Sequence, residues 1–189
     1  CISIAKNKQI GYLSQNVIES LDHTLKEEAL LVFKRVIEVE KRMTQLANEY
    51  ALNPNNREIE KKYTNIVDEF DRLGGYDYNY QIEMMLFKFG FTQDVIDRPI
   101  KTFSGGERTK MAFVKLLLAK PDLLILDEIF GLIDYDIISL EDLNNLIAAK
   151  NDSMDLILTG RNLPEGMMEI ADCVYSIHTE KEQSPEILE

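Results

Sequence analysis

Residues 123–128 have the sequence Leu123-Leu124-Ile125-Leu126-Asp127-Glu128, an unbroken apolar run that ends in two acids. A short apolar run without alternation is typical of a strand buried on both faces of a parallel sheet. Ligands of α/β folds bind where such strands end. Asp127 could therefore hold Mg²⁺ through water, and Glu128 could take a proton from an attacking water. The simpler alternative is a solvated pair of acids that merely ends a strand.

A glycine-rich turn precedes this strand and consists of Ser104-Gly105-Gly106-Glu107-Arg108. It opens a predicted helix that runs to about Ala119, so unpaired N–H groups and the positive end of the helix dipole lie at the turn. Such a helix start attracts phosphate, and glycine lets the backbone come close to the anion. The alternative is a plain helix start capped by Ser104. The acid pair that follows the turn favours the phosphate site.

The chain beyond about residue 90 alternates between strands and helices. We expect further strands at 155–159, again buried, and at 173–177, with helices at about 140–149 and 164–171. This alternation implies parallel strands and a doubly wound core. Near the start of the chain, two short strands are predicted at 2–4 and 9–13, with a polar turn between them.

A helical region separates the early strands from the later ones. Thr24 is a candidate N-cap, and from there to residue 50 apolar residues recur in alternating steps of four and three, which is the spacing of a coiled-coil seam. The turn at 53–56 breaks the helix, and the seam resumes over 59–73. Two such helices should pack as an antiparallel hairpin over about 24–73. A third amphipathic helix is predicted around 82–89.

The composition is that of a globular protein and excludes some functional classes. The 189 residues are 45% hydrophobic and 29% charged, with a formal net charge of -12. That acidity gives no support for a large nucleic-acid interface, which needs clustered Lys and Arg. Cys1 and Cys173 do not suggest a disulfide framework, and no apolar run is long enough to span a membrane, so a cytoplasmic protein is expected. The first residue is Cys, which suggests a fragment or an engineered chain.

Four stretches occur in the order typical of ATP-binding cassette (ABC) ATPases of the ABC-F subfamily. The resemblance covers residues 1 to about 134. The segment 9–15 resembles the Q-loop, Gly74-Gly75-Tyr76 resembles the sequence after the ABC-F helical hairpin, 101–110 resembles the ABC signature, and 116–128 resembles the Walker B strand. The fold class that follows is α/β, a P-loop NTPase-like parallel sheet with an inserted α-helical hairpin subdomain.

This resemblance implies ATP and Mg²⁺ as cofactors and gives each matching residue a role. Gln15 would sense the γ-phosphate, Mg²⁺ and the lytic water, Asp127 would serve Mg²⁺, and Glu128 would be the catalytic base. The nucleotide-binding residues of the signature and the D-loop would be Ser104, Gly105, Gly106, Glu107 and Asp134. The signature would contact a nucleotide held by a second cassette in head-to-tail arrangement, and the hairpin would reach the ribosome.

Departures from the ABC-F pattern begin after the acid pair. Residues 129–134 replace the usual Pro-Thr-Asn-His-Leu-Asp, and Thr159-Gly160-Arg161 stands where a switch His is expected. His23 and His178 are not placed to replace it and are expected on the surface. The chain has no Gly-x-x-x-x-Gly-Lys-Ser/Thr, the loop that holds the β- and γ-phosphates. We therefore expect the isolated chain to be inactive, and whether it is an enzyme is left open.

The last third resembles a second family, the ATP-dependent corrinoid adenosyltransferases. The similarity covers about 123–180, and its most specific part is Thr159-Gly160-Arg161 after a predicted strand. Members of that family move the adenosyl group of ATP to a cobalt corrinoid. The alternatives for the whole chain are thus a partial ABC-F ATPase, an adenosyltransferase, or a catalytically silent chimeric scaffold. A surface position or an ion pair at the sheet edge is the simpler interpretation of Arg161.

The expected organisation has three parts. Residues 1–16 and 91–180 would form a partial P-loop NTPase-like core, 17–90 an inserted helical subdomain, and 181–189 an acidic tail.

Overall fold

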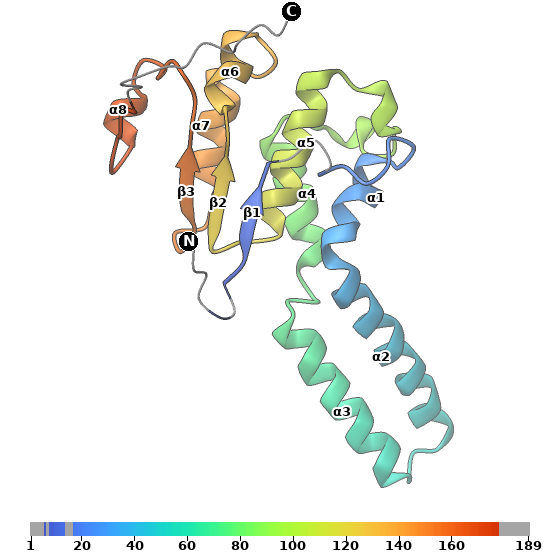
Figure 1. Cartoon of the computed structure of the whole chain (residues 1–189). Coiled ribbons are helices and arrows are strands. Elements are labelled where there is room, and N and C mark those ends of the chain that lie inside the picture. Colours follow the sequence, from blue (N-terminus) through green and yellow to red (C-terminus); the bar gives the residue numbers. More distant parts are fainter. Residues whose placement is uncertain (1–5, 7, 14–16, 178–189) are drawn as a thin grey trace, which may run out of the picture.

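The computed structural model describes residues 6, 8–13 and 17–177, and Figure 1 shows a small α/β core from which a long helical hairpin projects. The elements in chain order are β1 (Ile10–Tyr12), α1 (Leu25–Leu30), η1 (Leu31–Phe33), α2 (Lys34–Leu52), α3 (Arg57–Arg72), α4 (Tyr78–Lys88), η2 (Gln93–Val95), η3 (Ile100–Thr102), α5 (Gly105–Leu118), β2 (Leu123–Leu126), α6 (Ile129–Asp134), α7 (Leu140–Ala149), β3 (Asp155–Leu158) and α8 (Met167–Ile170).

The sheet has three parallel strands in the order β1-β2-β3. Ile10 pairs with Leu123, and Leu123 pairs in turn with Asp155, so all three strands end at the same edge. Helix α5 leads into β2 and runs in the opposite direction, which brings its first residue to that edge (Figure 1). The predicted fold class, a P-loop NTPase-like parallel α/β sheet with a helical hairpin, is confirmed.

One face of the sheet carries the core. The β2 side chains Leu124 and Leu126 are fully buried, as are Phe113 on α5 and Leu143 on α7. Helix α5 forms because Ser104 and Glu107 close a capping box at its start and its apolar side chains repeat at helical spacing. Burial of these large apolar side chains is the main source of stability for such a core.

The prediction of strands buried on both faces was wrong for the described residues. Leu123 and Ile125, on the other face of β2, are only half buried, and Asp155 and Ile157 of β3 are exposed. The reason is that helices α5 and α7 pack on one face, while the other face of the sheet is turned toward the viewer in Figure 1. A doubly wound arrangement is therefore absent from the described part of the chain.

The C-terminal prediction needs two corrections. Residues 173–177 form no strand, because this segment pairs with no neighbour and exposes both of its alternating faces, with Tyr175 86% and Ile177 96% exposed. The predicted helix at 164–171 is shorter and covers only α8. Helix α6, directly after the acid pair, was not predicted. The helices predicted at about 104–119 and 140–149 are confirmed as α5 and α7.

The hairpin is confirmed, although its first helix is interrupted. Thr24 caps α1 with Glu27 as predicted, and the single turn η1 then separates α1 from α2. Helices α2 and α3 pack side by side, with the rings of Tyr50 and Tyr63 stacked 6.1 Å apart near the tip. Gly74 ends α3 at a φ of 70°, a left-handed value that favours glycine. The coiled-coil character of this pair stays a prediction.

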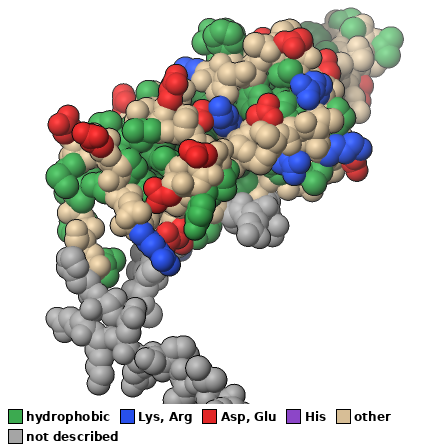
Figure 2. Space-filling view, turned by 90° about the horizontal axis from the view of Figure 1, so that it is seen from above, with side chains coloured by type: hydrophobic (Ala, Val, Ile, Leu, Met, Phe, Trp, Pro, Cys, Tyr) green, Lys and Arg blue, Asp and Glu red, His purple; other side chains and the backbone are tan. Residues whose placement is uncertain are grey.

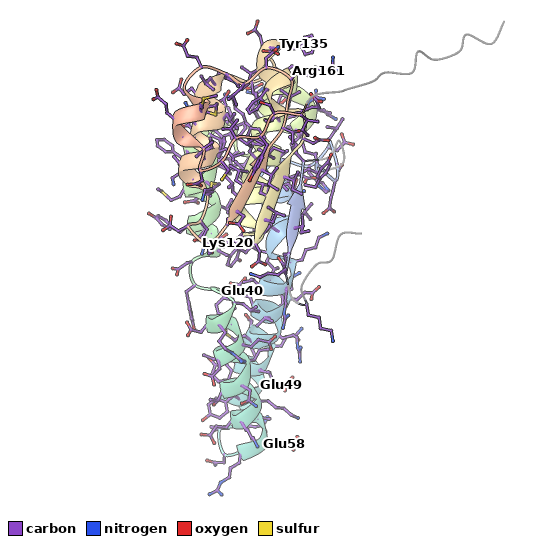
Figure 3. All side chains as sticks on the ribbon, turned by 60° about the vertical axis from the view of Figure 1, so that its left-hand side comes forward. Glu40, Glu49, Glu58, Lys120, Tyr135 and Arg161 are labelled. Carbon is purple, nitrogen blue, oxygen red and sulfur yellow. The ribbon has the colours of Figure 1, made fainter. Side chains whose placement is uncertain are left out.

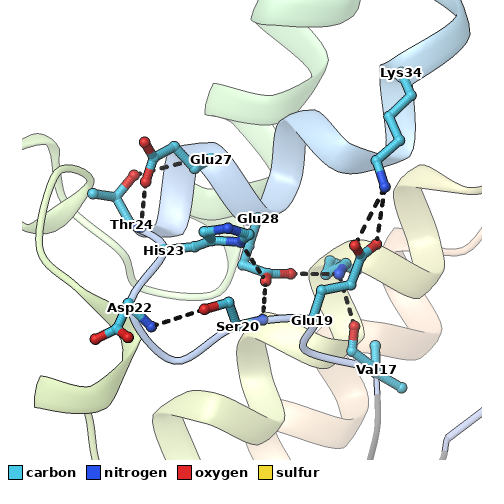
Figure 4. A network of polar contacts seen from close by, with 10 residues as sticks. Val17, Glu19, Ser20, Asp22, His23, Thr24, Glu27, Glu28 and Lys34 are labelled. Carbon is cyan, nitrogen blue, oxygen red and sulfur yellow. Dashed lines mark hydrogen bonds and ion pairs between the residues drawn. The ribbon is translucent and has the colours of Figure 1, made fainter.

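A buried polar network, which was not predicted from the sequence, connects the helical region to α5 (Figure 4). Lys115 on α5 donates to the carboxylate of Glu28 on α1 and, at 2.7 Å, to the carbonyl of Val17. The Glu28 carboxylate also accepts from the Ser20 amide at 2.8 Å and lies 3.0 Å from Nδ1 of His23. Every oxygen of this buried acid is thus paired.

Several predictions lie outside the described residues. These are the strand at 2–4, the residues Gln15, Cys1 and His178, and the tail 181–189. Within the described part, Cys173 is a free, exposed thiol, and His23 is half exposed rather than fully on the surface. None of the helices in that part combines the length and the hydrophobicity that a membrane span requires. The domain limits at 17–90 stay a prediction.

Candidate functional site

The acid pair lies at the carboxyl edge of the sheet, where three strand ends converge on Asp127. Asp127 follows β2, and its carboxylate accepts from the Thr159 hydroxyl at 2.5 Å and from the Tyr12 hydroxyl at 3.0 Å. Tyr12 is the last residue of β1, and Thr159 is the first after β3. Side chains at the ends of the two outer strands therefore hold Asp127, at the end of the central strand, in place.

Glu128 occupies an unusual backbone position. Its φ of 52° lies in the left-handed region, which non-glycine residues rarely adopt, and it occupies the position before α6 without a side-chain cap. Its amide donates to the Thr159 hydroxyl oxygen at 2.8 Å, so one threonine bridges both acids. Its side chain is exposed. Strained backbone of this kind is enriched at functional sites, because neighbouring contacts must hold it there.

Hydrogen bonding favours the ionised form of the Asp127 carboxylate. The Thr159 hydroxyl, followed by the Tyr12 hydroxyl, lowers the pKa of Asp127 from its usual value of 3.8. The same contact raises the pKa of Tyr12, because the phenol donates to a negative group. Asp127 therefore carries a full negative charge at neutral pH.

The pKa of Asp127 should rise toward its usual value in a Tyr12→Phe variant, since one of its two hydroxyl donors is removed. The carboxyl ¹³C shift of Asp127, followed by NMR through an acid titration, measures this. Tyr63→Phe, in the hairpin, is the matched control and should leave the titration unchanged. An identical Asp127 titration in both variants would contradict the proposed role of Tyr12.

The start of α5 lies at the same end of the molecule as the acids. Ser104 and Glu107 cap each other: Ser104 N donates to the Glu107 carboxylate at 2.7 Å, and Glu107 N donates to Ser104 Oγ at 3.2 Å. The Ser104 hydroxyl and the Glu107 carboxylate are thus engaged in the cap. Gly105 is exposed, whereas Gly106 lies against the carbonyl of Ile137, where a Cβ would come within 2.2 Å of that oxygen.

The remaining site residues lie around these two features. Asp134 ends α6 and accepts from Asn162 at 3.0 Å, so it belongs to a helix rather than to a loop. Figure 3 shows Arg161 and Tyr135 at this end of the molecule, far from the hairpin. Figure 2 looks onto the same end and shows Asp and Glu side chains interspersed with Lys and Arg. The surface is therefore mixed in charge.

The metal-binding capacity of this edge is limited. In the described ranges no group of three or more His, Cys, Asp or Glu side chains is placed to hold a metal ion. Asp127 offers one ionised carboxylate that is exposed to solvent. A single carboxylate suits Mg²⁺, which keeps several waters and takes its other ligands from phosphates. Asp127 thus fits a magnesium ion that arrives with a nucleotide.

Comparison with known proteins gives two matches of similar extent. The model of the family described as ATP:corrinoid adenosyltransferase BtuR/CobO/CobP matches residues 61–186. The chain belongs to this family. The match begins well before residue 123, where the sequence had suggested that the similarity starts.

ABC-F proteins are also similar to the chain. It is 30% identical over 139 residues to ABC transporter F family member 2 of Arabidopsis thaliana, which covers 70% of this chain and 20% of that protein. It is 36% identical over 133 residues to the putative ATP-binding protein YdiF of Bacillus subtilis, covering 69% and 21%. A shorter match, 37% over 71 residues, covers 38% of this chain and 12% of the energy-dependent translational throttle protein EttA of Mycobacterium tuberculosis.

The chain spans about a fifth of the length of the ABC-F relatives that it matches over most of its own length. The adenosyltransferase match and the longer ABC-F matches each cover about two thirds of the chain, so they must overlap. Both predicted resemblances are confirmed, and both point to ATP-using proteins.

Sequence reasoning missed the two hydroxyls that hold Asp127. Thr159 was identified only as part of the Thr159-Gly160-Arg161 stretch after a predicted strand, and Tyr12 only as part of the predicted strand and Q-loop-like segment at 9–15; neither was expected to contact Asp127. The available signal was positional: both stand at the carboxyl ends of predicted strands, and parallel strands end at one edge. Recognising that these two strands flank β2 would have brought both residues to Asp127.

Proposed function

We propose that the chain supplies part of an ATP·Mg²⁺ site, and that its longer ABC-F-type parent binds and hydrolyses ATP. The observation that supports this best is the ionised Asp127 at the carboxyl edge of the sheet, held by Thr159 and Tyr12. The start of α5 lies at the same end of the sheet (Figure 1), and its exposed first residue, Gly105, is a suitable phosphate contact.

Each residue then has a defined task. Asp127 holds Mg²⁺ through water, and the ion neutralises charge on the phosphates when it is bound. Glu128, exposed and adjacent, accepts the proton of the attacking water. The backbone amides of Gly105 and Gly106, with Ser104, contact the γ-phosphate. Gln15, Glu107 and Asp134 complete the set that the ABC-F similarity implies.

A complete site of this kind would be formed by two cassettes, each supplying part of the nucleotide contacts. The α5 start would face a nucleotide held by that cassette in head-to-tail arrangement, as the ABC-F similarity implies. The hairpin of α2 and α3 would be the arm that acts at the ribosome. The similarity to a protein named a translational throttle supports this part of the proposal.

Titration calorimetry with ATP tests the site. We expect weak binding, with a dissociation constant in about the millimolar range, that requires Mg²⁺ and is lost in Asp127→Asn. Asp152→Asn, an exposed acid outside the site, is the control. An ATP affinity that is unchanged both without Mg²⁺ and in Asp127→Asn would contradict the assignment of Asp127.

Turnover of ATP by the isolated chain should be indistinguishable from background. The loop that holds the β- and γ-phosphates is absent from the sequence, so the reacting phosphate is not positioned. Phosphate release measured with parent and Glu128→Gln chains checks this. Steady hydrolysis that Glu128→Gln abolishes would show that the chain is a complete ATPase.

Adenosyl transfer from ATP to a cobalt corrinoid is the second candidate. Its support is the family match over 61–186 together with the Thr159 contact to Asp127. Incubation with ATP and a cobalt(I) corrinoid, followed by its visible spectrum, separates the candidates. Formation of the adenosylated corrinoid would favour the transferase, whereas its absence together with Mg²⁺-dependent ATP binding would favour the ABC-type site.

A further inference from the structure

Residues 159–162, which follow β3, have no task of their own in the proposed ATP site. In the structure this segment contacts α6 and the residue before it at three successive levels. From the start of the helix to its end, the pairs are Thr159 with Glu128, Gly160 with Phe130, and Asn162 with Asp134. The segment is therefore packed along the element that connects the two acids to Asp134.

Gly160 is the residue that allows this segment to come close to α6. A Cβ at this position would lie 2.6 Å from both Cβ and Cδ2 of Phe130. Phe130 is only 5% exposed, so its ring has little room to move away. A glycine is thus needed for the close approach, and that approach places the preceding residue, Thr159, beside the acids.

The Thr159 hydroxyl forms two hydrogen bonds whose directions are fixed. A backbone N–H can only donate, so the hydroxyl oxygen accepts from the Glu128 amide at 2.8 Å. The single proton of the hydroxyl is then free for the carboxylate of Asp127, to which it donates at 2.5 Å. The result is a continuous chain of bonds from the backbone of one acid, through Thr159, to the side chain of the other.

This chain of bonds holds both acids in the form that a metal–nucleotide site needs. The φ of Glu128, 52°, is unfavourable and persists only where neighbouring contacts hold it, and the bond to Thr159 is such a contact. At Asp127 one oxygen accepts from Thr159 and the other from Tyr12, which leaves a lone pair on each for water bound to Mg²⁺. Hydrogen bonds of this kind orient carboxylates toward a metal ion.

We propose that Thr159 is a positioning residue of the ATP·Mg²⁺ site, whose hydroxyl couples the orientation of the Asp127 carboxylate to the backbone conformation of Glu128. Gly160 and Asn162 keep the segment that carries this hydroxyl against α6. The inference rests on the proposed function, because a positioning role requires a metal–nucleotide complex to be bound. Thr159 acts through the two acids rather than on the nucleotide.

Three variants of the full chain test the proposal with two measurements. Thr159→Val removes both bonds at nearly constant volume, Thr159→Ser keeps the hydroxyl, and Thr64→Val, at an exposed position of α3, is the matched control. Hydrogen exchange of the Glu128 amide, followed by NMR without ligand, should accelerate roughly tenfold in Thr159→Val. NMR titration with Mg²⁺·ATP should show binding weakened by roughly tenfold or more. Thr159→Ser should restore both values, and Thr64→Val should change neither.

Two further variants separate the coupling from the loss of any single contact. Tyr12→Phe removes the other donor to Asp127 and should leave the exchange of the Glu128 amide unchanged. Gly160→Ala keeps the Thr159 hydroxyl but displaces the segment, so it should accelerate that exchange as Thr159→Val does. It also replaces Thr159→Val if that variant fails to fold. A normal melting curve for each variant shows that the fold is retained.

The outcomes distinguish this proposal from the proposed function. Unchanged exchange of the Glu128 amide in Thr159→Val, or an affinity for Mg²⁺·ATP equal to that of the parent chain, would overturn the positioning role and leave the ATP site standing. Failure of Thr159→Ser to restore both values would also overturn it, since the hydroxyl would not be the group that matters. A parent chain that does not bind Mg²⁺·ATP would refute the proposed function, and the positioning role with it.

Discussion

Lys115→Met should lower the free energy of unfolding by about 3–5 kcal/mol, among the largest effects expected of a single substitution in this chain. Lys115 is 8% exposed and Glu28 is fully buried, so the variant leaves an ionised carboxylate inside the protein without its cation. Urea denaturation followed by circular dichroism measures the loss.

Two controls separate the buried pair from a general effect of removing a lysine. Lys62→Met breaks an exposed pair with Glu58 and should cost less than about 1 kcal/mol. The double variant Glu28→Gln/Lys115→Met removes both charges while keeping an acceptor for the Ser20 amide, and should recover much of the loss. A Lys115→Met chain as stable as Lys62→Met would show that the pair contributes little.

The same network makes an acid-dependent contribution to stability. Burial opposes ionisation of Glu28, but hydrogen bonds from Lys115, the Ser20 amide and His23 outweigh it and lower the pKa of the carboxyl from 4.5. A group whose pKa is lower in the folded state stabilises the fold fully above its unfolded pKa. This stabilisation is therefore complete above about pH 4.5 and is lost as the pH falls below it.

This network also shows where sequence reasoning stops. Helix α5 and strand β2 were predictable because capping residues and apolar periodicity are local signals. The contact between Glu28 and Lys115 joins residues 87 apart in sequence. In the sequence, nothing distinguishes this buried Glu and Lys from the many Glu and Lys residues on the surface. Only the packing of α1 against α5 brings them together.

The errors at the C-terminus have a related cause. The apolar residues at 173–177 suggested a strand, but a strand needs a partner, and the described sheet ends at β3. Helix α6 was not predicted because the sequence before it contains no typical N-cap residue. Glu128, which precedes it, has a left-handed backbone conformation and forms no side-chain cap. Partner choice and backbone strain are decided by tertiary structure, so local patterns predict them poorly.

The acids and the glycine turn of the candidate site were predictable from the sequence. The neighbouring residues that hold them in position were not. Asp127 and Glu128 were identified from the end of an apolar run, and Ser104–Gly106 from the helix start. The contact of Gly106 with the Ile137 carbonyl depends on α6 and the turn that follows it. That contact holds the start of α5 against the segment between α6 and α7, and it has a consequence for stability.

Gly106→Ala should destabilise the chain by about 1–3 kcal/mol, whereas Gly105→Ala should be neutral or stabilising by up to about 1 kcal/mol. A Cβ on Gly106 would lie 2.2 Å from the Ile137 carbonyl oxygen, which is backbone and must move, while a Cβ on Gly105 meets nothing within 4 Å. Both residues lie in the first turn of α5, so alanine helps the helix equally at the two positions.

Any difference between the two variants therefore reports the contact with Ile137. Thermal denaturation of both chains measures it. A displaced helix start should also weaken Mg²⁺·ATP binding in Gly106→Ala, since Gly106 lies in the proposed phosphate contact. Equal stability of the two variants would mean that the Ile137 carbonyl moves away from the added Cβ at little cost in free energy. The start of α5 would then not be held in position by its neighbours, and its suitability as a preorganised phosphate contact would be lost.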